Sequence, residues 1–134
     1  MRRALVAATT VLAGFTWGCS APTSPLDLVG TYSLKSVSGM PLPYQLPQAG
    51  SITVHVLDDL LILTPSGTYS EVGHKLVNVA GSVSVETPID AGNFRRRGDA
   101  ITMESLLIGT WTGTVGDDGA LRMTQQGLTL EYRR

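Results

Sequence analysis

From residue 28 to the end of the chain, apolar and polar positions alternate with a period of two, in short runs. In residues 31–37, Tyr32 and Leu34 fall on one side of the pattern, and Thr31, Ser33 and Val37 fall on the other. Because side chains of a strand point alternately to its two faces, this period predicts half-buried β-strands. Similar runs cover residues 51–57, 60–64, 67–72, 82–87, 91–96, 100–105, 110–115, 120–125 and 128–132.

Turn-forming sequences separate these runs, and no window after residue 25 has the 3.6-residue period of a helix. Gly and Asp tolerate the positive φ that tight hairpins require. In a short chain, consecutive strands pair as hairpins, and closing the sheet removes its exposed edges. The pattern therefore predicts an all-β fold, an antiparallel up-and-down β-barrel of eight to ten short strands. The predicted turns are Asp58-Asp59, Ser66-Gly67, Ala80-Gly81, Gly98-Asp99, Asp117-Asp118-Gly119 and Gln126-Gly127.

One segment, residues 38–50, interrupts this rhythm with three prolines. Proline cannot donate a hydrogen bond to a strand ladder, so the segment is predicted to be a loop or an extended cover. Apolar residues alternate within it, which gives it one apolar side that packs over the domain. We expect it to act as a lid at the barrel mouth. The alternating residues are Met40, Leu42, Tyr44 and Leu46.

The first 25 residues have a different character. A basic start at Arg2 and Arg3 precedes an uncharged apolar run over residues 4–15, as in the n- and h-regions of a secretory signal. The only cysteine, Cys19, follows with Gly18 before it, and this resembles the lipobox of bacterial lipoproteins. In that family the cysteine is acylated after cleavage, and several acyl chains anchor the protein permanently.

These features divide the chain into three predicted parts. Residues 1–18 form a lipoprotein-type signal peptide, residues 19–27 an acylated Cys19 with a Ser/Pro-rich tether, and residues 28–134 the barrel domain. The expected location is the cell envelope, with the exported protein held at a membrane through Cys19. The alternative is a periplasmic or secreted protein released by cleavage after Ala21.

Several weak motifs after residue 28 are similar to those of small lipocalin-like bacterial lipoproteins. They are "VGTYSLKSVSGMPLPYQLP", "LTPSGTYSEV", "GNFRRRGDAITM", "GTVGDDGALRM" and the terminal "LEYRR". In the wider lipocalin family, a Gly-x-Trp in the first strand packs against an arginine from the far end of the barrel. The resemblance implies that Gly30 and Tyr32 take the first role, with Tyr in place of Trp. It also implies that Arg133 or Arg134 supplies a cation that stacks on the ring.

Composition and charge exclude some functions. The net charge is −1 for the chain, and −3 from Cys19 onward, so no nucleic-acid partner is expected. A single cysteine excludes an internal disulfide, and His55 and His74 have no metal-ligand spacing. No nucleophile elbow and no paired catalytic carboxylates stand out, so no enzymatic activity, cofactor or metal is expected. The run of arginines at residues 95–97 is interpreted as a solvated strand end, with contact to anionic lipid headgroups as the alternative.

The first hypothesis is a binding module for a small apolar or amphipathic ligand inside the barrel. The second is an envelope structural or interaction protein, or an inhibitor, with a filled core that acts on a protein partner through its surface. The alternation and the resemblance leave both open. The candidate ligand-binding residues are Tyr32, Leu34, Tyr44, Tyr69, Phe94 and Trp111.

Overall fold

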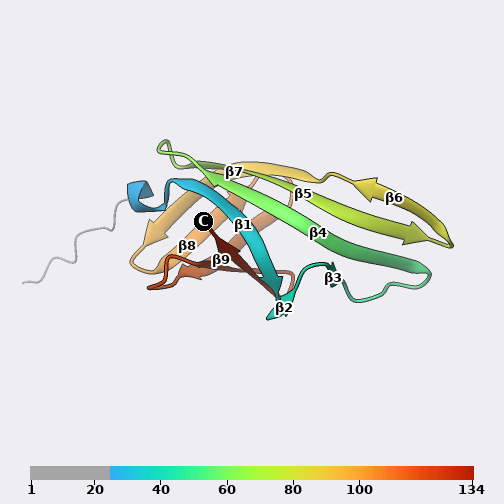
Figure 1. The fold of residues 1–134 in the computed structure, drawn as a ribbon. Helices are drawn as coiled ribbons and strands as arrows, with labels where there is room; N and C mark the ends of the chain where they lie inside the picture. The colour runs from blue at the N-terminus through green and yellow to red at the C-terminus, as the bar shows by residue number, and fades with distance from the viewer. Residues whose placement is uncertain (1–24) are drawn as a thin grey trace, which may run out of the picture.

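The computed structural model describes residues 25–134 (Figure 1). The predicted signal peptide, the anchor residue Cys19 and most of the tether lie outside the described residues. A 3-10 helix, η1 (Pro25–Leu28), leads into the sheet. Eight strands form the barrel: β1 (Gly30–Val37), β4 (Ile52–Leu63), β5 (Thr68–Val79), β7 (Ile89–Arg97), β8 (Ala100–Ser105), β9 (Gly109–Val115), β10 (Leu121–Gln125) and β11 (Leu128–Arg133).

Antiparallel pairing runs from β4 through β5, β7, β8, β9 and β10 to β11. Strand β1 pairs with β11 on one side and with β4 on the other, which closes the sheet into a barrel. Three short strands lie outside this ring: β2 (Met40–Pro41), β3 (Tyr44–Gln45) and β6 (Ser82–Glu86). The predicted all-β, antiparallel up-and-down barrel is therefore confirmed.

The prediction of a turn at Asp58-Asp59 is wrong. Both residues lie inside β4, which pairs with β5 along its whole length, from Ile52 to Leu63, with one bulge. A bulge at Leu57 separates the pairs that Val56 and Asp58 make with β5. The extra residue keeps the two strands together and brings Asp59 to the inner side of the sheet.

A second bulge, in β1, changes the side of the strand to which Val37 belongs. The alternation sets Val37 on the same side as Thr31 and Ser33. Leu34 pairs with Tyr132 and Ser36 with Glu131, so Lys35 is the extra residue. The shift turns Val37 inward, where it is fully buried. The alternation therefore holds as far as Leu34 and reverses beyond it, because a bulge changes which face the following residues occupy.

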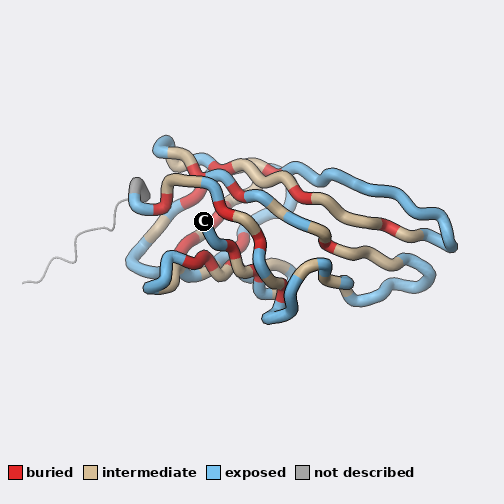
Figure 2. Tube along the Cα trace, viewed as in Figure 1, coloured by how far each residue is buried: buried red, intermediate tan, exposed pale blue. Residues whose placement is uncertain are grey.

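Side chains fill the barrel interior, and buried positions concentrate there rather than on the strands that project from it (Figure 2). Each inner position is contributed by alternate residues of a strand, as in other small barrels. The interior is thus a packed core. Its largest fully buried members are Tyr32, Tyr132, Leu61, Leu63, Ile101, Met103, Leu121, Met123 and Val37.

One end of the barrel is closed by the contact that the lipocalin resemblance implied. The guanidinium carbon of Arg134 lies 5.1 Å from the centroid of the Tyr32 ring. Arg134 also donates hydrogen bonds to the Tyr32 hydroxyl and to the carbonyls of Asp27 and Val29, while Tyr32 donates to the Leu28 carbonyl at 2.9 Å. These bonds fasten η1 over the barrel end.

The proline-rich segment bridges β1 and β4 at the other end. Its strand β2 pairs with the end of β1, and β3 pairs with β4. Leu42, Tyr44 and Leu46 pack against the core, as the apolar alternation predicted, whereas Met40 points into solvent. The segment covers the barrel on the β1–β4 side of this end.

Strands β4 and β5 are longer than their neighbours and project beyond the barrel. With β6 they form a three-stranded extension that we call the arm, at the right of Figure 1. Within residues 25–134, no helix combines the length and the hydropathy needed to cross a membrane.

The contact at the closed end predicts a stability difference between the two C-terminal arginines. Arg134→Ala removes the stacking and the bonds to η1, and we expect it to lower the free energy of unfolding by about 1–3 kcal/mol in urea denaturation. Arg133→Ala is the control, because Arg133 is half-exposed and forms only surface ion pairs with Asp118 and Glu131. Equal losses in the two variants would contradict this role of Arg134.

Candidate functional site

A hollow of about 300 Å³ lies at the end of the barrel opposite η1. It lies among β4, β5, the start of β7 and the β8–β9 and β10–β11 turns. We call this end of the barrel the mouth. The apolar wall of the hollow is formed by Pro88, Ile89, Leu107 and Ile108. Its polar lining is formed by Asp59, Glu71, Lys75, Asp90, Gln125 and Gln126.

Two carboxyl groups of the mouth, Asp59 and Glu71, interact directly through their side chains, and each shifts the pKa of the other. The Tyr132 hydroxyl donates to this pair and lies 3.3 Å from both Asp59 Oδ2 and Glu71 Oε1. Asp59 Oδ1 is buried and has no hydrogen-bond partner among the described residues. An ionised carboxylate left in this way is costly, which favours a protonated form of the pair.

Burial raises the pKa of Glu71 from 4.5 to about 9, and the hydrogen bond to Asp59 and the charges of Asp59 and Asp90 add to the shift. Burial also raises the pKa of Asp59. Two neighbouring carboxylates do not ionise together in a poorly solvated site, so the pair holds one proton at neutral pH. The mouth thus contains one hydrogen-bonded carboxyl pair with a single negative charge.

A second network, centred on Asp90, lies beside the first. Asp90 is 8% exposed; its Oδ2 accepts from the Tyr69 hydroxyl at 2.7 Å and its Oδ1 from Ser105 Oγ at 2.7 Å. Trp111 Nε1 donates to the Tyr69 oxygen at 3.2 Å, and the two rings meet edge to face. Burial and the bond to Asp90 raise the pKa of Tyr69 to about 12, so it remains a donor.

The local sequence explains why Tyr69 reaches Asp90. Tyr69 pairs with Gly92, and a Cβ at Gly92 would lie 3.0 Å from the Tyr69 ring and would collide with the Glu104 carbonyl. Glycine therefore leaves room for the ring to lie across β7. The Ser105 oxygen also accepts from the backbone N–H groups of Leu107 and Ile108, which fixes the β8–β9 turn at the rim.

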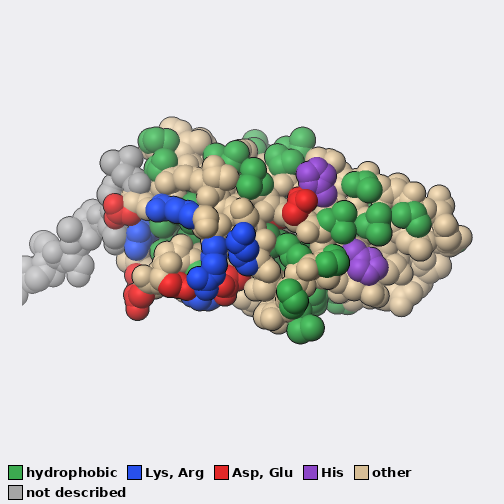
Figure 3. All heavy atoms as spheres, in the orientation of Figure 1, with side chains coloured by type: hydrophobic (Ala, Val, Ile, Leu, Met, Phe, Trp, Pro, Cys, Tyr) green, Lys and Arg blue, Asp and Glu red, His purple; other side chains and the backbone are tan. Residues whose placement is uncertain are grey.

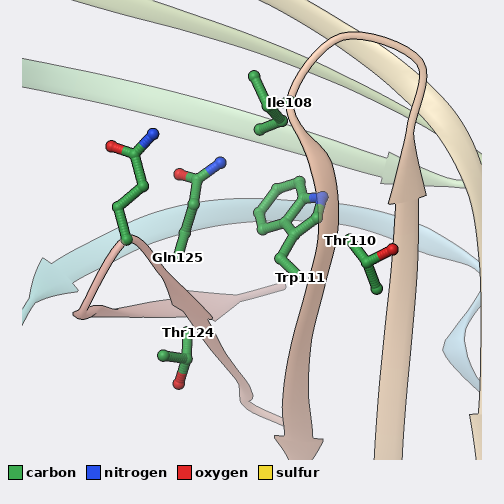
Figure 4. Close-up of a pocket in the computed structure, with 6 residues that line it drawn as sticks. Ile108, Thr110, Trp111, Thr124 and Gln125 are labelled. Carbon is green, nitrogen blue, oxygen red and sulfur yellow. The ribbon is translucent and has the colours of Figure 1, made fainter.

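A smaller hollow of about 110 Å³ adjoins the first, and the two share Ile108, Gln125 and Gln126. Figure 4 shows the Trp111 ring next to Ile108 and Gln125, on the side of the hollow that Thr110 and Thr124 also line. Trp111 is 3% exposed. It therefore separates the packed core from the mouth.

The residues predicted to bind a ligand lie in different parts of the barrel. Tyr69 and Trp111 contact each other beneath the mouth. Tyr32 lies at the closed end, and Leu34 and Phe94 are buried in the core. Tyr44 is half-buried on the proline-rich segment and pairs with Val56 of β4. Their role in ligand binding stays a prediction.

Sequence reasoning missed the charged and hydroxyl groups of the mouth, above all Asp59, Glu71 and Asp90. Asp59 belongs to an Asp-Asp pair, which favours a turn in sequence and conceals its place inside a strand. Glu71 follows Tyr69 by two positions, so the period of two that marks Tyr69 as inward also marks Glu71 as inward. That alternation was the available signal. The sequence analysis also missed the rim residues Leu106 and Leu107, which are 79% and 75% exposed.

Most of the remaining candidate groups of the sequence lie on the outer surface. His74 Nδ1 lies 2.6 Å from Asp58 Oδ1, and histidine side chains lie over the arm in Figure 3. Arg95 is exposed and pairs with Glu104. The Arg96 side chain is only 12% exposed; it pairs with Asp99 and donates to the Gly98 carbonyl, so the solvated strand end predicted for residues 95–97 does not hold for Arg96. Among residues 25–134, no three His, Cys, Asp or Glu side chains are grouped to hold a metal ion.

In the comparisons with known proteins, no family model, no curated protein and no solved structure matches the chain.

The proton on Glu71 predicts how stability depends on pH. Between the ordinary pKa of 4.5 and the raised value of about 9, the folded protein holds a proton that the unfolded chain has lost. The free energy of unfolding therefore falls as pH rises through this window, by up to about 1.4 kcal/mol per pH unit. Glu71→Gln keeps the shape and removes the titration, so we expect a flatter profile and a more stable protein at pH 8.

Urea denaturation of the wild type and of Glu71→Gln at several pH values measures this difference. Glu86→Gln makes the same change at an exposed position of β6 and controls for the loss of one negative charge. If Glu71→Gln kept the pH profile of the wild type, Glu71 would be ionised in the folded protein and the shared proton would not exist.

Proposed function

We propose that the protein is a binding module, rather than an enzyme, that holds a small amphipathic molecule at the mouth of a lipocalin-like barrel. The observation that carries the proposal is the division of the 300 Å³ hollow into an apolar wall and a floor of buried carboxyl groups. Ligand pockets commonly combine an apolar lining with a few placed polar groups, and this volume is at the small end of their range. Because the core beneath is filled, the ligand lies at the mouth.

The polar end of the ligand follows from the charge of the floor. Three carboxyl groups, Asp59, Glu71 and Asp90, face one lysine, Lys75, and the carboxyl pair holds one proton. The sum is one negative charge, which favours a hydrogen-bond donor or a cation and disfavours a carboxylate. The proposed ligand therefore carries a short apolar chain, bound along Ile89, Leu107 and Ile108, and a protonated amine or a hydroxyl group.

Three probes with the same eight-carbon chain test this proposal: octylamine, octan-1-ol and octanoate. We expect octylamine to bind most tightly and octanoate most weakly, since only the headgroup differs. The readout is Trp111 fluorescence in a Trp17→Phe background, because Trp111 borders the adjoining hollow. Failure of both octylamine and octan-1-ol to bind would overturn the proposal, and tighter binding of octanoate would overturn the assigned headgroup.

Two adjacent leucines of the rim provide a matched pair of variants. Leu107 lines the hollow and Leu106 does not, although both are exposed. We expect Leu107→Ser to weaken octylamine binding about 5- to 30-fold, as expected for the loss of one apolar side chain contact. Leu106→Ser should leave the affinity unchanged, and an equal effect of both changes would move the ligand away from the mouth.

A second candidate function, an envelope interaction protein that acts on a protein partner through its surface, is favoured by the filled core and by the exposed apolar turn at residues 106–108. A contiguous apolar surface is typical of interaction sites. The probe experiment distinguishes the two functions. A binding module should bind octylamine or octan-1-ol, whereas an interaction protein requires no small molecule at the mouth.

We also propose that the protein is exported and anchored in the cell envelope through acylated Cys19. The support is the sequence of residues 1–25 alone. In a bacterial host supplied with labelled palmitate, the wild-type chain should take up the label and sediment with membranes. Cys19→Ser should lose both, whereas Ser20→Ala, its neighbour, should keep both. Release of the wild-type protein without label would support secretion after Ala21 instead.

A further inference from the structure

The arm presents a strand whose outer edge is unpaired among the described residues. Strand β6 pairs with β5 from Lys75–Glu86 to Val79–Ser82, and all five of its residues are exposed. Val83 and Val85 are 58% and 60% exposed, and the β6 end of the arm is pale blue in Figure 2. An edge strand carries a row of free N–H and C=O groups that another strand can pair with.

The opposite edge of the arm, along β4, is covered. Tyr44 pairs with Val56, the Leu46 N–H donates to the Val54 carbonyl at 2.9 Å, and Ala49 forms a bridge to Ile52. This cover belongs to the proline-rich segment, whose prolines cannot extend the sheet further. The fold therefore protects one edge of the arm and leaves the other open.

The open edge has little of the usual protection against association. Strand β6 contains no proline, its pairing with β5 has no bulge, and its one charged residue is Glu86, at its end. Monomeric proteins commonly place charges, prolines or bulges at such edges. Its hairpin is also tight, because Ala80 and Gly81 both have positive φ and the Gly81 N–H donates to Asn78 Oδ1 at 2.9 Å. Strand β6 is thus fixed in an extended conformation in which its outer edge can pair with another strand.

We propose that the partner is a second copy of this chain, paired antiparallel through β6 about a two-fold axis at Ser84. The sequence of β6, Ser-Val-Ser-Val-Glu, has the same order of polar and apolar residues from either end. Pairing about Ser84 sets Val83 opposite the second copy's Val85, and Ser82 opposite its Glu86. No charge meets a like charge, and such a self-complementary contact is the form that two-fold dimers require.

The apolar side chains of the arm support this register. Val85 lies opposite Leu76 in β5, so both project from the same face of the sheet as Val83. In the dimer, the valines of the two β6 strands form one strip on that face, continuous with Leu76 of each copy. The two arms join into a six-stranded sheet that leaves its outer edges under the proline-rich segments.

The first test measures the mass of the full chain by sedimentation velocity over a concentration series. The proposal predicts twice the monomer mass at the upper concentrations, and a monomer at every concentration would overturn it. Pairing of β6 with an extended segment of a different protein would give that monomer result and is thereby distinguished from self-association.

Engineered cysteines in a Cys19→Ser background test the register. Ser84→Cys places two thiols on the two-fold axis, where opposite Cα atoms of an antiparallel pair are about 4.5–5.5 Å apart, within disulfide range. Mild oxidation should therefore cross-link most of the dimer. Ser82→Cys is the matched control, since its two copies would lie about 13 Å apart along the strand, four residues at 3.3 Å each. A dimer that cross-links through Ser82→Cys and not through Ser84→Cys would overturn the register.

Two charged variants at Ser84 provide a further test of the dimer and include a control for misfolding. Ser84→Lys and Ser84→Glu each set like charges directly opposite one another, so each variant alone should sediment as a monomer. Mixed in equal amounts, they should regain the dimer mass as heterodimers, which misfolded variants could not do. Dimers in either variant alone, or no dimer in the mixture of two folded variants, would overturn the proposal.

Discussion

The pairing of β1 with both β4 and β11 is the constraint on which the rest of the structure depends. It turns an open sheet into a ring, removes two edges and fixes which side chains point inward. Strand β1 pairs with β4 through residues 30–33 and with β11 through residues 33–37, so each half of the strand holds one side of the closure. Arg134 and Tyr32 then fasten the N-terminal helix across the end that the ring leaves open.

Closure also explains why the functional groups lie at one end. A ring of eight strands is narrow enough for its own side chains to fill it, so ionisable groups remain near the mouth. There the Asp59–Glu71 pair and the Asp90 network are partly shielded from water and bonded by Tyr132, Tyr69 and Ser105. Such buried polar networks hold a defined geometry at the expense of stability, which is common where a protein binds a ligand. The length of β4 and β5 beyond the ring creates the arm.

Much of the fold followed from the alternation of residues, because a closed barrel imposes a period of two on every strand. Tyr32, Tyr69 and Trp111 face inward, and Leu42, Tyr44 and Leu46 of the proline-rich segment pack on the core, as the alternation predicts. Met40 belongs to the same alternation and is exposed. The two errors, Asp58-Asp59 and Val37, share one cause: each lies at a β-bulge, which shifts the period by one residue and leaves no mark in composition. The mouth was harder to predict, since its acidic residues come from β4, β5 and β7 and only the pairing of these strands brings them together.

In the folded protein, the Asp59–Glu71 pair at the mouth holds a proton at neutral pH. A pH titration of the Glu71 side-chain carboxyl carbon, followed by NMR in the folded protein, measures this protonation. We expect a midpoint near the raised pKa of about 9 and a protonated Glu71 at neutral pH. A midpoint near the ordinary value of 4.5 would show that Glu71 is ionised at neutral pH and would contradict the raised pKa.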